Sequence, residues 1–385
     1  MSVVIPKISA KKLRDRINIK ARASRIPLSA DIEIIATCNF KCVHCYIAPC
    51  AEREDVMSLE QVEFVFDQLK AAGTMMVLLT GGEIFTHKRF KEIYLSAKRH
   101  GFDVYLNTNA YLIGKRWADF LAEYPPAALS ISIYGLTPES YERLTGIPRA
   151  YERVMQAIDL LVERKVHFDL KCPAMTITRD EIVAMQAFAE SKGVSFRTDF
   201  IMNPQERGST EPLQYQLPTA QIMEISRLLD PGHEKMRKYA ATRVTGETTS
   251  QVYKCGAGLT SLHINVHGGV STCSTSRKVL GNIFEQPFAD IWEALGGKVS
   301  VTYPVGHPCA TCKFSRICAG CPATVEQLTG MPTGYVQHYC QITHQRAYEL
   351  GYHPTGVPRT MTEGIPGHIR TVNSAAARRL PVLSA

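Results

Sequence analysis

Three cysteines within eight residues, Cys38, Cys42 and Cys45, constrain this chain more than any other feature of its sequence. Gaps of three and two residues let one loop place three thiolates around a compact centre, and thiolates suit either zinc or an iron–sulfur cluster. A structural zinc site needs four ligands, and the nearby candidates for a fourth are His44 and Cys50. Three ligands on a four-iron cluster would leave one iron open. We favour the iron–sulfur interpretation.

The length of the chain predicts more than one structural unit. At 385 residues, 45% of them hydrophobic, the chain exceeds the roughly 250–300 residues at which a single core stops growing. We expect an N-terminal extension at 1–30, a main domain at 31–235, a smaller domain at 236–350 and a tail at 351–385.

The composition predicts where in the cell the protein works and which partners it lacks. No apolar run reaches the ~18 residues of a membrane span, and the start of the chain lacks the apolar core of a signal peptide. The twelve cysteines cluster in short spacings, which is typical of metal sites in a reducing compartment. We expect a cytoplasmic protein with no membrane partner. The formal charge of +8 is not gathered in a long Lys/Arg run, so no nucleic-acid partner is expected either.

Between Asp31 and about Phe200 the chain alternates short β-rich runs with longer helical patterns, which is typical of parallel βα units. One helix has an explicit start, because Ser58 and Gln61 form a Ser-x-x-Gln capping box, and Gly73 marks its expected end. The six expected strands are Asp31–Ala36, Met75–Thr80, Asp103–Asn107, Ala127–Tyr134, Val166–Lys171 and Ser195–Phe200.

These strands are apolar on one face and polar on the other. On the fourth, Leu129, Ile131 and Ile133 oppose Ser130 and Ser132, because successive side chains point to opposite faces. Ordinary parallel sheets are apolar on both faces, and a full eight-stranded barrel packs its interior with branched apolar residues. The alternation predicts an α/β fold: a partly open six-stranded (β/α)6 barrel with helices outside and a polar lumen.

The loop after the second expected strand reads Thr-Gly-Gly-Glu at 80–83. It lies, like the cysteine loop, at a C-terminal strand end, where parallel βα folds place active sites. Together with the Cys-x3-Cys-x2-Cys spacing and His44 before its last cysteine, this loop resembles the radical S-adenosylmethionine (SAM) enzymes. One departure is Ile84, which stands where the family often has proline.

The resemblance implies a site residue by residue. Cys38, Cys42 and Cys45 would hold a [4Fe–4S] cluster with SAM on its open iron, and Gly81, Gly82 and Glu83 would hold the methionyl end of SAM. Ser132 occupies the fourth-strand position that often contacts the ribose in the family, and strand alternation places Lys171 or Arg197 where either could meet the SAM carboxylate. An internal ion pair of Arg197 with Asp169 or Asp199 is an equal alternative. Many relatives have an acidic residue near that serine, whereas this chain has Tyr134 before Gly135.

Seven further cysteines follow the expected barrel. Their spacing resembles the SPASM extension of radical SAM enzymes, which usually holds two auxiliary [4Fe–4S] clusters and would bring the total to three. Two zinc knuckles are the alternative. One gap is shorter than usual, with two residues between Cys318 and Cys321. The resemblance assigns Cys255, Cys273 and Cys321 to an inner cluster, and Cys309, Cys312, Cys318 and Cys340 to an outer one.

The inner cluster would lack one cysteine, because Ser261 stands where the family often has the fourth. His263 and His267 compete for this place with an open site that a substrate thiolate could fill, and we favour the open site. Of the two leftover cysteines, Cys172 shares a strand face with apolar residues and is expected to be buried. Cys50 is expected to be structural or incidental.

The resemblance implies an enzyme that cleaves SAM to a 5′-deoxyadenosyl radical. Its most common substrate class is a ribosomally synthesised precursor peptide, modified by a cross-link, a thioether or a backbone rearrangement. Maturation of a protein side chain, as in sulfatase activation, and oxidation of a small molecule are alternatives, and so is a non-enzymatic iron–sulfur or zinc sensor or electron-transfer protein. Too few residues precede the first strand for a winged-helix leader-binding element, so we expect a separate leader-recognition protein. A flavodoxin or ferredoxin would serve as reductant.

Overall fold

A computed structural model describes residues 9–47, 54–206, 208–241, 243–244, 248–276, 278–352 and 371–372. Cys50 and most of the expected tail lie outside these residues. The helices are α1 (Ala10–Ala23), α2 (Leu59–Ala71), α3 (Phe90–Arg99), α4 (Lys115–Glu123), α5 (Pro138–Thr145), α6 (Ala150–Glu163), α7 (Ile182–Ser191), α8 (Thr219–Leu229), α9 (Glu234–Ala241), α10 (Phe288–Val299), α11 (Pro322–Thr329) and α12 (Gln337–Glu349). The short 3-10 helices are η2 (Ile84–Thr86), η3 (Arg179–Glu181), η4 (Glu211–Tyr215), η5 (Pro308–Ala310) and η6 (Ser315–Ile317).

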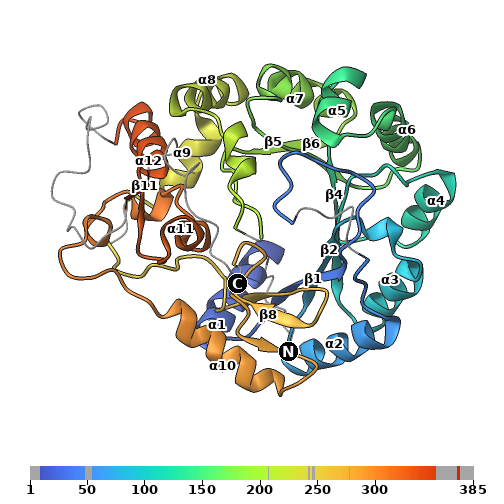
Figure 1. The fold of residues 1–385 in the computed structure, drawn as a ribbon, viewed down its shortest axis with the longest axis horizontal. Helices are drawn as coiled ribbons and strands as arrows, with labels where there is room; N and C mark the ends of the chain where they lie inside the picture. Colours follow the sequence, from blue (N-terminus) through green and yellow to red (C-terminus); the bar gives the residue numbers. More distant parts are fainter. Residues whose placement is uncertain are drawn as a thin grey trace, which may run out of the picture.

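The strands are β1 (Ser29–Ile35), β2 (Met76–Gly81), β3 (Asp103–Thr108), β4 (Ala128–Ser132), β5 (Asp169–Pro173), β6 (Ser195–Asp199), β7 (Ser261–Ile264), β8 (Gly269–Ser271), β9 (Gly281–Asn282), β10 (Tyr335–Val336) and β11 (Thr371–Val372). Within the described residues, nine of them form one sheet in the order β6-β5-β4-β3-β2-β1-β7-β8-β9. Neighbours from β6 to β7 are parallel, and β8 and β9 add antiparallel pairs. The strands curve around an open centre with helices outside (Figure 1), which confirms the predicted partial barrel.

The six expected strands all form, but the fifth begins later than predicted. Lys165 has a positive φ of 57°, and Val166 N–H still donates to Leu161 O at the end of α6. The chain is therefore leaving the helix where the apolar run begins, and regular pairing with β4 starts at Asp169.

The predicted alternation of faces is confirmed. On β5, Leu170 and Cys172 are buried beneath the helices, whereas Asp169 and Lys171 face the lumen and are half-buried. The buried role predicted for Cys172 is thus correct. Removing such apolar faces from water stabilises the barrel by roughly 25 cal/mol per Å².

The predicted capping box of α2 is present. Ser58 Oγ accepts from Gln61 N–H at 3.2 Å, and Gln61 Oε1 accepts from Ser58 N–H at 2.8 Å. The helix buries an apolar face that includes Val62 and Phe66. Gly73, at φ +90°, ends this segment, because glycine adopts that conformation without strain.

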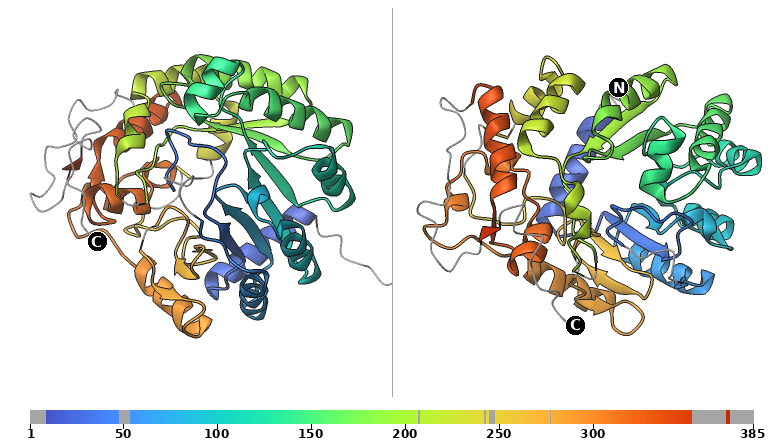
Figure 2. Two further views of the ribbon diagram at one scale, coloured as in Figure 1. Left: turned by 45° about the vertical axis from the view of Figure 1, so that its right-hand side comes forward. Right: turned by 45° about the horizontal axis from the view of Figure 1, so that its top comes forward.

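The second region begins as an extension of the barrel sheet. Strand β7 pairs with β1, and one continuous hydrophobic core includes Val270 of β8 and Leu295 of α10. Beyond α10 the described elements lie to one side of the barrel (Figure 2), and all of them except α12 are short. Helix α9 spans the boundary predicted at 235/236. The domain limits proposed from the sequence stay a prediction. None of the described helices is long and apolar enough to cross a membrane.

Candidate active site

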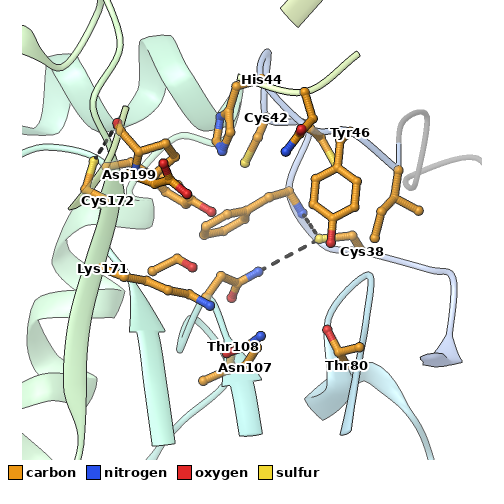
Figure 3. A pocket seen from close by; sticks show the side chains of 18 of the residues that line it. Cys38, Cys42, His44, Tyr46, Thr80, Asn107, Thr108, Lys171, Cys172 and Asp199 are labelled. Carbon is orange, nitrogen blue, oxygen red and sulfur yellow. Dashed lines mark hydrogen bonds between the residues drawn. The ribbon is translucent and has the colours of Figure 1, made fainter. Parts of the chain in front are cut away.

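The cysteine loop follows β1 and forms one wall of a cavity of about 710 Å³. Cys38, Cys42 and Cys45 all line this cavity and are half-buried. Figure 3 shows Lys171 reaching toward the centre from the side opposite Cys38 and Cys42. The cavity therefore lies at the C-terminal ends of the barrel strands, as predicted, with thiols on one side and polar lumen side chains on the other.

Gly81 and Gly82 hold the end of β2 against the start of the cysteine loop. A Cβ at Gly81 would overlap Ile35 O, and a Cβ at Gly82 would overlap Thr37 O. Gly82 N–H donates to Ile35 O at 2.8 Å, and Glu83 N–H donates to Thr37 O at 3.0 Å. The close approach that requires glycine is thus made to the chain's own backbone, and both glycines still line the cavity.

The Glu83 side chain is buried behind this loop, with 1% of its surface exposed. Its carboxylate accepts from Thr108 Oγ1 at 2.7 Å, Asn109 N–H at 2.7 Å and Phe85 N–H at 3.2 Å. Burial raises the pKa of Glu83 to about 6, while these three donors act in the opposite direction. Glu83 therefore joins the end of β3 to the loop after β2, and its carboxylate does not line the cavity.

Asn109 is a site residue that sequence reasoning missed. Its Nδ2 lies 3.9 Å from Cys38 Sγ and donates to Asn39 Oδ1 at 3.0 Å, and its Oδ1 accepts from Tyr111 N–H at 3.0 Å. The backbone N–H of Phe40 also points at Cys38 Sγ, at 3.4 Å. A signal existed: Asn109 follows the third strand directly, at the same edge of the sheet as the two predicted loops.

The donor set fits an iron–sulfur cluster. Burial raises the pKa of the Cys38 thiol to about 12 and that of Cys42 well above its ordinary range, and neighbouring thiols add to both shifts. Thiols that repel one another as thiolates are stabilised together by a bound cation. Burial lowers the pKa of His44 to about 4, and its Nδ1 is buried without a hydrogen-bond partner among the described residues.

In the lumen, Arg197 is paired with Asp169. Its Nη2 lies 2.8 Å from Asp169 Oδ2 and donates to Ser130 Oγ at 2.9 Å. This is one of the two internal pairs considered from the sequence. Lys171 donates no hydrogen bond to another described residue, and its pKa is lowered to about 8, first by burial and then by Arg197. Ser132 is half-buried and lines the cavity beside these groups.

Tyr134, where relatives have an acid nearby, is buried against the cysteine loop. Its ring lies 5.2 Å from that of His44. Glu181 of η3 approaches the same turn from outside the cavity and accepts from Leu136 N–H at 2.5 Å. The loop is therefore backed by an aromatic pair at this point.

The second region gathers its cysteines into two groups. Burial raises the pKa of Cys273 to about 11, and the neighbouring thiols of Cys321 and Cys255 contribute. A second group surrounds Cys309, whose pKa rises to about 12 through burial and the thiols of three neighbours, Cys318, Cys312 and Cys340. These are the two sets that the SPASM resemblance implies, and their roles as ligands stay a prediction.

The candidates for a fourth inner ligand lie on or beside β7. Ser261 begins that strand and pairs with Ser29 of β1. His263 is buried with its Nε2 3.5 Å from Glu33 Oε1, and His267 Nε2 lies 3.8 Å from Asp55 Oδ1. Both histidines therefore lie beside carboxylates of the barrel region.

Comparison with known families agrees with both halves of this description. The model of the radical SAM superfamily matches residues 32–188. The model of an iron–sulfur cluster-binding domain, SPASM, matches residues 255–322. These spans contain the barrel cysteine loop and six of the seven later cysteines.

Individual relatives are similar over most of the chain. An AdoMet-dependent heme synthase of Methanosarcina barkeri is 24% identical over 77% of this chain and 92% of its own. The antilisterial bacteriocin subtilosin biosynthesis protein AlbA of Bacillus subtilis is 26% identical over 77% of this chain and 67% of its own. The crystal structure of Streptococcus suis SuiB bound to precursor peptide SuiA shares the fold, with a TM-score of 0.66 and 17% identity over 86% of this chain and 83% of that one. With the cysteine loop, the cavity and the second cysteine region, these matches show that the chain belongs to the radical SAM superfamily and is a radical SAM enzyme with a SPASM domain.

Proposed function

We propose that this enzyme modifies a ribosomally synthesised precursor peptide by forming a cross-link or thioether or by rearranging the backbone. The observation that carries the proposal is the cavity itself. It is large, about 710 Å³, and extends from the cysteine loop at Tyr46 to the segment after β6 at Asn203. A cavity of this extent can receive an extended peptide segment beside SAM. Two similar proteins support the proposal: AlbA is a bacteriocin biosynthesis protein, and the structure of SuiB contains a bound precursor peptide.

In this proposal Cys38, Cys42 and Cys45 would hold a [4Fe–4S] cluster that also binds SAM. Such a centre would supply, together with SAM, the radical chemistry of the reaction: one electron for reductive cleavage of SAM and a radical able to take a hydrogen atom from the substrate. The protein's own part is to bind, orient and exclude water. The backbone at 81–83 holds the amino end of SAM, with the Glu83 carboxylate as support behind it, and Ser132 holds the ribose.

Lys171 is the preferred partner of the SAM carboxylate. Arg197 is already held by Asp169 and Ser130, whereas the Lys171 ammonium donates to no other described residue. A carboxylate beside it would offset the burial that lowers its pKa. Arg197 then links β6 to Asp169 of β5 and Ser130 of β4. The exposed part of its guanidinium is left to contact the substrate.

The SPASM region completes the proposal with two auxiliary [4Fe–4S] clusters on the two cysteine groups, three clusters in all. We keep the open site on the inner cluster, because the two histidines that compete for it lie beside Glu33 and Asp55. A substrate thiol bound there would be deprotonated, with its proton released to solvent and its sulfur held by the metal, which suits thioether chemistry. A Mössbauer spectrum showing that the protein supplies a ligand to all four irons of this cluster would rule out the open site.

The proposal is tested by anaerobic reconstitution with the small peptide encoded beside the gene of this chain, if one is present. We expect 5′-deoxyadenosine to form in proportion to modified peptide, which mass spectrometry detects as the loss of two hydrogen atoms for a cross-link or thioether. SAM cleavage that no peptide stimulates would contradict the proposal.

A second candidate is oxidation of a small molecule, and similarity to the heme synthase over 92% of that protein favours it. In the same assay, an iron porphyrin would then stimulate 5′-deoxyadenosine formation and be converted, whereas the peptide would not. The two candidates therefore predict opposite responses to the same pair of substrates.

If the substrate carries a leader, the proposal includes a separate leader-recognition protein. The described residues before β1 form one helix, α1, and the following Arg25 is held by Trp292 and Glu293 of α10. Fluorescence anisotropy should show weak leader binding by this chain alone. Tight binding without a second protein would count against that part of the proposal.

A further inference from the structure

A second cavity, of about 470 Å³, lies between the end of α1, the end of α10 and the two cysteine-bearing segments of the SPASM region. Four cations line it: Arg22, Arg243, Lys254 and Arg316. The described residues of its lining include no aspartate or glutamate. Cations gathered around one concave surface concentrate positive potential there.

Helix α1 adds to this potential. Its exposed cations outnumber its one acid, Asp15, and are Lys12, Arg14, Arg16, Lys20 and Arg22. Long-range attraction depends on the summed charge of a surface rather than on single contacts. We call the cavity lining together with α1 the basic surface.

The basic surface touches both groups of SPASM cysteines. Arg22 Nη1 donates to Cys255 O at 2.9 Å. Lys254 Nζ donates to Ser315 O at 3.1 Å, in the segment between Cys312 and Cys318. Cys255 and Cys318 are themselves exposed. Clusters held by these groups would therefore lie close to the protein surface and beside the basic surface.

The basic surface also lies away from the substrate cavity. Arg22 precedes β1, and Ser261, shortly after Cys255, pairs with Ser29 at the first residue of that strand. The cysteine loop of the radical site follows the other end of β1. A strand of this length separates its ends by roughly 20 Å, so a partner at one end leaves the other free.

We propose that a one-electron carrier protein with an acidic surface docks on the basic surface and delivers electrons through the SPASM clusters. The inference rests on the auxiliary clusters of the proposed function and adds where their partner binds. In each transfer the carrier is oxidised by one electron and a cluster is reduced by one electron. A small anion would need only the cavity, whereas an acidic protein also explains the excess charge on exposed α1.

The test compares two charge reversals in the reconstituted enzyme. The double variant R243E/K20E alters the basic surface at two exposed side chains. Among the described residues, Arg243 donates to Tyr239 O at 3.2 Å and lies over the ring of the same tyrosine, and neither contact involves a cysteine segment. The control K115E/R116E makes the same change in charge at the exposed start of α4, on the opposite flank of the molecule in Figure 1. Iron content is measured for each, so a missing cluster is distinguished from a missing partner.

Reduction of the clusters by a reduced flavodoxin is followed by stopped flow without peptide. We expect the R243E/K20E rate constant to fall about tenfold at low salt, and the affinity for flavodoxin, measured by biolayer interferometry, to fall similarly. Salt at about 0.5 M should erase the difference. Reduction by dithionite and the behaviour of K115E/R116E should match the wild type.

Unchanged flavodoxin rates in R243E/K20E, an equal loss in K115E/R116E, or an equal loss with dithionite would each overturn the proposal. So would calorimetry in which inorganic phosphate binds the wild type but not R243E while flavodoxin reduces both equally, because the cavity would then be a small-anion site. None of these measurements uses the peptide. A failure of the peptide assay can therefore be distinguished from a failure of the docking proposal.

Discussion

The barrel and the SPASM region hold their cysteines in different ways. In the barrel, three thiols lie on one loop above a continuous core whose largest buried side chains include Phe66, Phe90 and Tyr94. In the SPASM region, seven thiols are spread from Cys255 to Cys340. Beyond α10, Ile342 of α12 joins the continuous core, and most of the other buried apolar residues described there form small separate clusters, such as Val325, Leu328, Val336 and Tyr339.

This difference indicates how far the stability of each region depends on binding an iron–sulfur cluster. The barrel loop is backed by Asn109 and by backbone contacts at 81–83, so the protein alone prepares that site. Apart from Ile342 of α12, the buried apolar residues of the segment from 301 to 350 lie mainly in small clusters, and clusters of this size bury too little apolar surface to make the segment rigid. Metal binding supplies folding free energy where a preformed core does not, so we expect the SPASM clusters to stabilise their own region.

The largest effect follows from removing the barrel ligands. Replacing Cys38, Cys42 and Cys45 with alanine should abolish 5′-deoxyadenosine formation and leave about two thirds of the iron, because the auxiliary clusters use other cysteines. Chromatography of the product and an iron assay measure both. Cys172→Ala is the matched control, because this residue borders the same cavity while its side chain is buried beside Leu170 on the apolar face of β5. This variant should keep both 5′-deoxyadenosine formation and its iron. A triple variant that still cleaves SAM would refute the assignment.

Chelation of all iron should separate the two regions. Amide exchange in α11, whose Val325 and Leu328 lie in a small cluster, should accelerate about 1,000-fold, whereas α2 and α3 should change far less because they pack on the continuous core. Hydrogen exchange with mass spectrometry measures both in one sample. Equal protection of the two regions after chelation would show that the SPASM region does not depend on its clusters for stability more than the barrel does.

Gly82→Ala tests the backbone contact between the two barrel loops. A Cβ there meets Thr37 O and Ala36 O, and backbone cannot move aside as a flexible side chain can. We expect a loss of about 3 kcal/mol in the free energy of unfolding, seen as a lower Tm. Gly114→Ala has nothing within 4 Å of its new Cβ and should be nearly neutral. Similar melting of both variants would contradict the close approach.

Glu83→Gln tests the buried carboxylate. One oxygen becomes an amide donor that faces Thr108 or Asn109, so at least one hydrogen bond is lost in a buried site. The expected cost is about 2 kcal/mol, measured by denaturant unfolding. The control Glu63→Gln keeps its Ser96 contact at a half-buried position and should cost much less. An equal cost for the two would show that Glu83 has no special supporting role.

Lys171 gives the smallest effect, a dependence of SAM affinity on pH. Its pKa is lowered to about 8, and the protonated ammonium binds the carboxylate. Affinity should therefore hold below pH 8 and fall about tenfold per unit above it, until the pKa of the complex is reached. Lys171→Arg should remove this dependence, because guanidinium stays charged. Calorimetric titration of SAM checks both, and a flat profile in the wild type would exclude Lys171 as the partner.

Several features of the barrel could be predicted from neighbouring residues alone. The capping box at Ser58 depends on a contact three residues along the chain, and the inward direction of Lys171 follows from the two-residue period of a strand. The late start of β5 could not be read this way, because the apolar run begins while the chain is still turning out of α6. Asn109 was missed for a different reason: its contact with Cys38 spans 71 residues.

The sequence by itself determined the spacing of the barrel thiols, the order of βα units and the polar lumen, since each depends on residues close together in the chain. Tertiary structure decided the rest. It placed the glycines at 81 and 82 against the backbone of β1, paired Arg197 with Asp169 and set β7 beside β1. It also gathered cysteines 85 residues apart, from Cys255 to Cys340, into two groups. Periodicity cannot encode such contacts, because they form only when distant segments pack on a common core.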